Sequence, residues 1–145
     1  MSERTGRCLC GAVRYRIAAE PGFTRICWCR DCQHIAGNGT VNMLVPAAAL
    51  DVSGATSAYT SMADSGNQIT RRFCPNCGCH LFADSSGRPH YTVVRAGTLD
   101  DPSSVTPSTN IWTSSAPGWA CMDTNLERVE RQPAPPQNPS GAVRP

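Results

Sequence analysis

The stretch Phe73-Cys74-Pro75-Asn76-Cys77-Gly78-Cys79-His80-Leu81 decides how the rest of this chain is expected to fold. Cys74 and Cys77 form a Cys-x-x-Cys turn. Pro75 fixes one backbone angle, and Gly78 permits the tight turn that brings backbone amides towards a metal-bound thiolate. Such a turn supplies two ligands, whereas a structural zinc is held by four in a tetrahedron, with Zn–S distances near about 2.3 Å. We therefore expect a second pair of ligands elsewhere in the chain.

The best candidates for that second pair are Cys8 and Cys10, which also lie close together and are followed by glycine. If both pairs bind one ion, the metal joins the N-terminus to the middle of the chain. Binding energy of order ~10 kcal/mol is folding energy in such a site, so loss of any ligand is expected to damage the fold. The sequence thus predicts a closed four-thiolate zinc site at Cys8, Cys10, Cys74 and Cys77.

A second cluster, Cys27-Trp28-Cys29-Arg30-Asp31-Cys32, lies between those two pairs and offers three thiolates at a spacing that suits one metal. Two interpretations remain open. The cluster is either a second structural zinc site or a site whose fourth position is left to water or substrate, as in catalytic zinc sites. A thiol bound at an open position would lose its proton and become a nucleophilic thiolate. In the structural interpretation, the fourth ligand would be His34, Cys79, His80 or Cys121.

Length and composition favour one small domain with reduced thiols. The chain has 145 residues and no apparent repeat, and its 40% hydrophobic share includes the nine cysteines. The apolar core is therefore modest, and a structural metal would supplement it. Nine is an odd number, and Cys-x-Cys and Cys-x-x-Cys spacings are more typical of metal chelation than of a secreted disulfide framework.

Charge and hydropathy argue against two classes of partner. The net charge of +2 is too small to indicate a nucleic-acid-binding protein. No apolar run approaches the roughly 20 residues of a membrane span, and the first seven residues lack the apolar segment of a secretory signal. We therefore expect a cytoplasmic protein without a membrane or nucleic-acid partner. All thirteen basic residues are arginine, which reflects either biased codon use or the bidentate binding of carboxylates.

Short alternating apolar patterns separated by turn residues predict a mostly β fold. Residues 30–36 are expected to form one short helical turn that ends at Gly37-Asn38-Gly39. We expect a domain over residues 1–132 and a proline-rich, disordered tail over residues 133–145. The predicted strands cover residues 13–17, 23–28, 40–45, 57–62, 68–73, 80–83, 91–96 and 110–113.

The cysteine motifs, in this order, resemble those of the glutathione-dependent formaldehyde-activating enzyme family, which also includes centromere protein V. The resemblance rests on Cys8-Leu9-Cys10-Gly11-Ala12-Val13-Arg14-Tyr15, on Cys27-x-Cys29-x-x-Cys32 and on Phe73-Cys74-x-x-Cys77-Gly78-x-x-Leu81. The later stretches at residues 96–102 and 110–112, and Trp119, fit it too. Asn110 stands where many relatives carry histidine, and Cys79 stands where a small polar residue is usual.

This resemblance implies a β-tent fold of stacked antiparallel sheets that binds two zinc ions. The first would be held by Cys8, Cys10, Cys74 and Cys77, and the second by Cys27, Cys29 and Cys32, where a substrate thiol would be activated. The implied activity is that of a carbon–sulfur lyase that joins glutathione, or a related thiol, to a small aldehyde such as formaldehyde. Arg30 and Arg72 are then candidates for holding glutathione carboxylates. The alternative is a non-catalytic, zinc-stabilised binding module, and the oligomeric state stays open.

Overall fold

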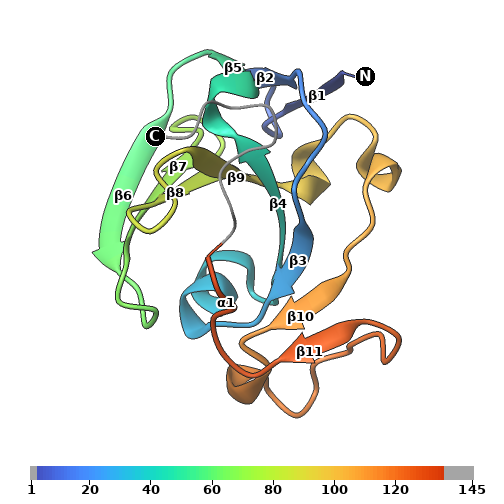
Figure 1. The fold of residues 1–145 in the computed structure, drawn as a ribbon. Helices are drawn as coiled ribbons and strands as arrows, with labels where there is room; N and C mark the ends of the chain where they lie inside the picture. The colour runs from blue at the N-terminus through green and yellow to red at the C-terminus, as the bar shows by residue number, and fades with distance from the viewer. Residues whose placement is uncertain (1–2, 136–145) are drawn as a thin grey trace.

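The computed structural model describes residues 3–135, so that most of the predicted tail, residues 136–145, lies outside the described part (Figure 1). The described chain is mostly β, as predicted. Its helices are α1 (Arg30–Ala36) and the short 3₁₀ turns η1 (Ala47–Ala49), η2 (Ala96–Thr98), η3 (Pro102–Ser104) and η4 (Thr113–Ser115). Its strands are β1 (Arg4–Arg7), β2 (Arg14–Ile17), β3 (Thr24–Cys27), β4 (Thr40–Pro46), β5 (Leu50–Ser53), β6 (Ser57–Met62), β7 (Gln68–Phe73), β8 (His80–Ser85), β9 (Tyr91–Arg95), β10 (Thr109–Ile111) and β11 (Glu127–Val129).

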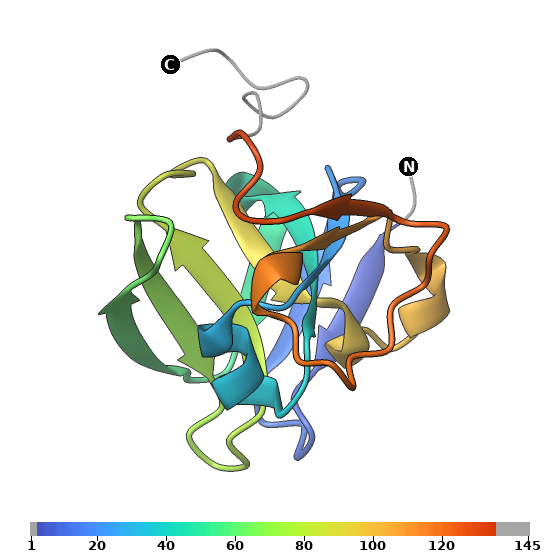
Figure 2. The ribbon, with the colours of Figure 1, turned by 90° about the horizontal axis from the view of Figure 1, so that it is seen from below.

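The strands form two sheets that stack on each other, which confirms the predicted fold class. The small sheet has the order β1-β2-β5, and the large one the order β11-β10-β3-β4-β9-β8-β7-β6. The large sheet curves from β6 at one edge to β10 and β11 at the other (Figure 1, Figure 2). Two of its pairings, β3 with β10 and β10 with β11, are parallel, so the sheets are not wholly antiparallel as expected.

The main core fills the space between the two sheets. Tyr15 of the small sheet meets Phe82 of the large one edge to face, with ring centroids 5.4 Å apart. Alternation along β2, where Tyr15 and Ile17 are buried and Arg14 and Arg16 are exposed, is what the sequence pattern predicted. The core residues are Cys8, Val13, Tyr15, Ile17, Met43, Val45, Cys74, Leu81, Phe82, Val94 and Leu99.

The opposite face of the large sheet carries polar side chains. Successive residues of a strand point to opposite faces, so Met43 and Val94 in the core place Asn42 and Arg95 on the other side. The strand register pairs Asn42 with Arg25 of β3 and with Arg95 of β9. These three residues therefore form a row across three neighbouring strands, on the face turned away from the small sheet.

The helix α1 begins where β3 ends. Cys29 is its N-cap, and the Cys29 Sγ accepts a hydrogen bond from the backbone N–H of Cys32 at 3.3 Å. Gly37 ends the helix in the left-handed conformation, with φ of 70°, which a residue without Cβ adopts most easily. The predicted helical turn at residues 30–36 is thus confirmed. None of the helices in residues 3–135 is long and apolar enough to cross a membrane.

Candidate metal centres and active site

The four cysteines of the two sequence pairs come together at the end of the core. The Sγ atoms of Cys8, Cys10, Cys74 and Cys77 all lie within 4.8 Å of one another. The sulfur of Cys10 is 3.7 Å from that of Cys8 and 3.8 Å from that of Cys74. A tetrahedral zinc with Zn–S bonds of about 2.3 Å has S···S edges of about 3.8 Å, so the sulfur spacing fits such an ion.

Two tight turns build this four-cysteine cluster. Gly11 and Gly78 both have positive φ, 84° and 77°, and the N–H of Gly78 donates to the carbonyl of Cys74 at 2.8 Å. Backbone N–H groups then point at sulfur, as the N–H of Val13 does towards Cys8 at 3.3 Å. Burial raises the pKa of the Cys8 thiol, but this hydrogen bond and those with neighbouring thiols outweigh it and bring the pKa to about 6.

The second cluster sits at the junction of β3 and α1. Cys27 ends the strand, Cys29 caps the helix and Cys32 lies in its first turn, and their Sγ atoms lie within 4.8 Å of one another. Hydrogen bonds from the Cys27 and Cys29 thiols lower the pKa of Cys32, and the nearby positive charge of Arg95 acts in the same direction. Three sulfurs at this separation could hold a metal ion.

None of the four residues considered as a fourth ligand joins this three-cysteine cluster in the part of the chain described. Cys121 is exposed, and His34 lies on the helix surface, 3.5 Å from a guanidinium nitrogen of Arg30. The His80 ring stacks on Phe73 with centroids 5.2 Å apart, and Cys79 packs against the main core. Within residues 3–135, this cluster therefore brings together three cysteines and none of the other candidate ligands.

A cavity with a free volume of about 90 Å³ and an open mouth lies against the three-cysteine cluster. A cavity of this volume holds several water molecules, since one water needs about 10–15 Å³ by the same measure. All three cysteines line the cavity, whereas no cysteine of the four-cysteine cluster is among its described lining residues. The two clusters thus differ in kind: one brings four cysteines together away from the cavity, and the other forms part of the cavity wall.

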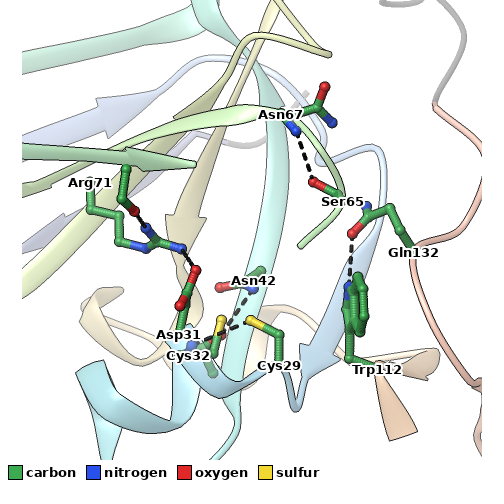
Figure 3. A network of polar contacts seen from close by, with 11 residues as sticks. Cys29, Asp31, Cys32, Asn42, Ser65, Asn67, Arg71, Trp112 and Gln132 are labelled. Atoms are coloured by element: carbon green, nitrogen blue, oxygen red, sulfur yellow. Dashed lines mark hydrogen bonds and ion pairs between the residues drawn. The ribbon is translucent and has the colours of Figure 1, made fainter. Parts of the chain in front are cut away.

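The cavity walls come from distant parts of the chain. Figure 3 shows Cys29 and Cys32 between Asp31 and Arg71 on one side and Trp112 on the other. Arg71 of β7 donates to Asp31 of α1 at 3.4 Å, which ties the large sheet to the helix.

Trp112 is a lining residue that sequence reasoning did not single out for the site. It has φ of 56° and ψ of 37°, and among the described residues it is the only non-glycine residue with positive φ. Such strain often marks functional positions and must be held by surrounding contacts. Here the indole Nε1 donates to Gln132 Oε1 at 3.0 Å, and the ring packs in the cluster that contains Cys27 and Cys32.

Arg30 and Arg72, the arginines expected to hold carboxylates, do not line the cavity. Arg72 follows Arg71 on β7 and therefore points to the opposite face, where it pairs with Asp84 at 3.0 Å and lies over the Phe82 ring. The exposed Arg30 bonds Gln33 on its own helix. The arginines that do line the cavity are Arg25, Arg71, Arg88 and Arg95.

Comparison with known proteins agrees with the cysteine motifs. The sequence model of the family described as "Glutathione-dependent formaldehyde-activating enzyme" matches residues 3–115, well over half of the chain. The chain belongs to this formaldehyde-activating family. A relative from Halomonas elongata, whose name provisionally describes it as a glutathione-dependent formaldehyde-activating enzyme, is 33% identical over 101 residues. That match covers 66% of this chain and 64% of the relative, so the chain spans under two thirds of the relative's length.

A solved structure supports the same fold. The crystal structure of a Rhodobacter sphaeroides protein superimposes with a TM-score of 0.56 and 25% sequence identity, over 71% of this chain and 91% of that chain. The match to the formaldehyde-activating family ends at residue 115, whereas Gln132, which also lines the cavity, lies beyond it. One part of the cavity wall is therefore contributed by sequence outside the family match.

Asn110 of β10 contacts the segment that carries the three-cysteine cluster through Trp28. It is fully buried, and its Oδ1 accepts a hydrogen bond from Trp28 Nε1 at 3.1 Å. Trp28 lies between Cys27 and Cys29, so this bond fixes the backbone that carries them. Asn110 does not line the cavity itself. Its Nδ2 is buried and has no hydrogen-bond partner within the described chain.

Proposed function

We propose that this protein is a zinc-dependent carbon–sulfur lyase that acts on adducts of glutathione, or a related thiol, with small aldehydes such as formaldehyde. The observation that carries the proposal is the difference between the two cysteine clusters. The four-cysteine cluster offers four thiolates to a tetrahedral zinc, whereas the three-cysteine cluster offers three and lines an open cavity. Three protein ligands with one open position is the usual arrangement of catalytic zinc.

The reaction needs no oxidant or further cofactor. In the synthetic direction the thiol sulfur forms a bond to the aldehyde carbon, the π bond of the carbonyl opens, and its oxygen takes up a proton. In the lyase direction the sulfur–carbon bond breaks, and the aldehyde and thiol are released. When bound, zinc would lower the pKa of a coordinated thiol, so that the sulfur reacts as a thiolate.

The chain's own residues would hold and shape this site. Cys27, Cys29 and Cys32 would be the zinc ligands, while Cys8, Cys10, Cys74 and Cys77 would hold a second zinc with a structural role. The ion pair between Arg71 and Asp31 keeps α1 against the sheet and so fixes the direction of the thiolates. The apolar wall residues, among them Phe23, Ile69 and Trp112, would exclude bulk water from the reacting sulfur.

Exchange spectroscopy by NMR tests this proposal, because it measures the interconversion of formaldehyde and S-hydroxymethylglutathione at equilibrium. The zinc-loaded protein is expected to accelerate this exchange above the uncatalysed rate, and Cys29→Ser is expected to abolish the acceleration. Serine is a preferred N-cap, so this variant keeps the start of α1 and most of the fold. Cys121→Ser, which changes an exposed cysteine outside both clusters, is the matched control.

If the wild type does not accelerate exchange, or if Cys29→Ser accelerates it equally well, the lyase proposal is wrong. The protein would then be a zinc-stabilised binding module without catalytic activity. Circular dichroism and the zinc content of each variant show whether a lost rate reflects a lost fold.

A further inference from the structure

The cavity holds more positive charge than its own carboxylates neutralise. Four arginines line it, and the carboxylates in its described lining are those of Asp31 and Asp64. Asp31 pairs with Arg71 at 3.4 Å, and Asp64 is exposed on the turn between β6 and β7. Burying an arginine is costly unless an anion or hydrogen-bond acceptors compensate its charge.

Arg95 is compensated from within the site. It donates from Nη1 to Asn42 Oδ1 and lines the cavity together with Cys27, Cys29 and Cys32. Three thiolates around a divalent ion carry a net negative charge, which the guanidinium beside them offsets. Arg71 and Arg95 therefore each have a partner for at least one guanidinium nitrogen, while the Nε of each is buried without a hydrogen bond in the described chain.

Of the four arginines that line the cavity, Arg25 and Arg88 remain to be accounted for. Neither forms an ion pair or a side-chain hydrogen bond within residues 3–135, and both are half-buried. Arg25 is held in place by stacking, because its Cζ lies 3.6 Å from the centroid of the Phe23 ring. Arg88 lies in the turn between β8 and β9 and lines the same cavity as Arg25. Two like charges held together at a cavity wall are stabilised by an anion placed between them.

We propose that Arg25 and Arg88 form a carboxylate-binding subsite, so that the cavity selects thiols that also carry a carboxylate. Arg25 and Cys27 are two residues apart on the same face of β3, which puts their Cα atoms about 7 Å apart. A ligand whose sulfur reaches the three-cysteine cluster therefore needs its carboxylate within the length of a short peptide, about 10 Å for three residues. This inference rests on the proposed function and adds a requirement for charge that a simple thiol does not meet.

Calorimetry with the zinc-loaded, full-length protein tests the requirement, with two ligands as probes. One is glutathione, and the other is its bis-amide, in which both carboxylates are replaced by neutral amides of nearly the same size. Because hydrogen bonds to charged groups contribute roughly 1.5–3 kcal/mol, we expect the bis-amide to bind wild-type protein about tenfold to hundredfold more weakly. This comparison needs no mutation and so does not depend on the folding of a variant.

The variants Arg25→Gln and Arg88→Gln then locate the effect. Each is expected to weaken glutathione binding about tenfold while leaving bis-amide binding nearly unchanged. The difference in affinity between the two ligands should therefore become smaller. Arg14→Gln, which changes an exposed arginine on the small sheet, should keep the full difference in affinity between the two ligands. The inference is wrong if wild-type protein binds both ligands with equal affinity. It is also wrong if the difference in affinity is as large in Arg25→Gln and Arg88→Gln as in the wild type. If neither ligand binds wild-type protein, the proposed function fails with it.

Discussion

At the scale of single residues, the face of the strand to which a side chain points matters as much as the identity of the residue. Arg71 and Arg72 are neighbours in the sequence, yet Arg71 lines the cavity and Arg72 covers Phe82 on the core side. A strand reverses the face of its side chains at every step, so an error of one position moves a predicted ligand to the wrong side of the sheet. The sequence indicated that arginines would line the site, but the strand register was needed to say which ones.

Tyr15 provides a pH-dependent test of the core. Its hydroxyl hydrogen-bonds with Thr98 Oγ1 at 2.7 Å, and burial raises its pKa to about 12. In the unfolded chain the phenol ionises near its ordinary pKa of about 10. The stability linked to this proton is therefore fully present below pH 10 and is lost as the pH rises from about 10 towards 12.

Tyr15→Phe removes both the hydrogen bond and the titration. We expect this variant to be about 0.5–1.5 kcal/mol less stable than wild type at pH 8, because it lacks the bond to Thr98. The difference should shrink as the pH rises above 10, where only the wild type loses stability through this group. Urea unfolding at pH 8, 9, 10 and 10.5 measures both effects. A difference that stays constant across these values would contradict the raised pKa.

At the scale of elements, the sequence predicted the strands with clear alternation and missed those that depend on their neighbours. β1 contains a glycine and two arginines in four residues, and it forms only because it pairs with β2. β5 follows a weakly helical run and pairs with the other edge of β2. β11 is three residues long and pairs in parallel with β10. Tertiary pairing, which no local pattern encodes, decides all three.

Two turns, one before β2 and one between β7 and β8, are held together by the four-cysteine cluster. Cys74 is fully buried there, so Cys74→Ser is expected to remove the structural metal and to unfold the protein. Metal binding in such sites contributes on the order of 10 kcal/mol, which is comparable to the whole stability of a small domain, about 5–15 kcal/mol. Thermal melting followed by circular dichroism, with zinc content measured in parallel, tests this expectation.

Cys121→Ser is again the control for this experiment. Because Cys121 is exposed and belongs to neither cluster, its replacement should change neither melting temperature nor zinc content. Folded Cys74→Ser protein with unchanged melting would show that the four-cysteine cluster has no structural role.

At the scale of the whole molecule, the order of the cysteine motifs was enough to predict the two clusters, because metal-ligating pairs must meet in space. The cavity could not be predicted in the same way. Its walls come from β3, α1, β4, β7, β8, β9, β10, Trp112 and the segment after β11, and they face one another only because the large sheet curves (Figure 1). Trp112 and Gln132, whose side chains meet across twenty positions of sequence, show no local signal of that contact.

X-ray absorption at the zinc edge tests most directly whether the three-cysteine cluster leaves one position for a substrate thiol. With two zinc ions bound, seven cysteine ligands give an average of about 3.5 sulfur atoms per zinc. Saturating glutathione is expected to raise this average to about four, and Cys29→Ser should not show the same rise. An average of four before glutathione is added, or a value that glutathione leaves unchanged, would contradict the proposed open site.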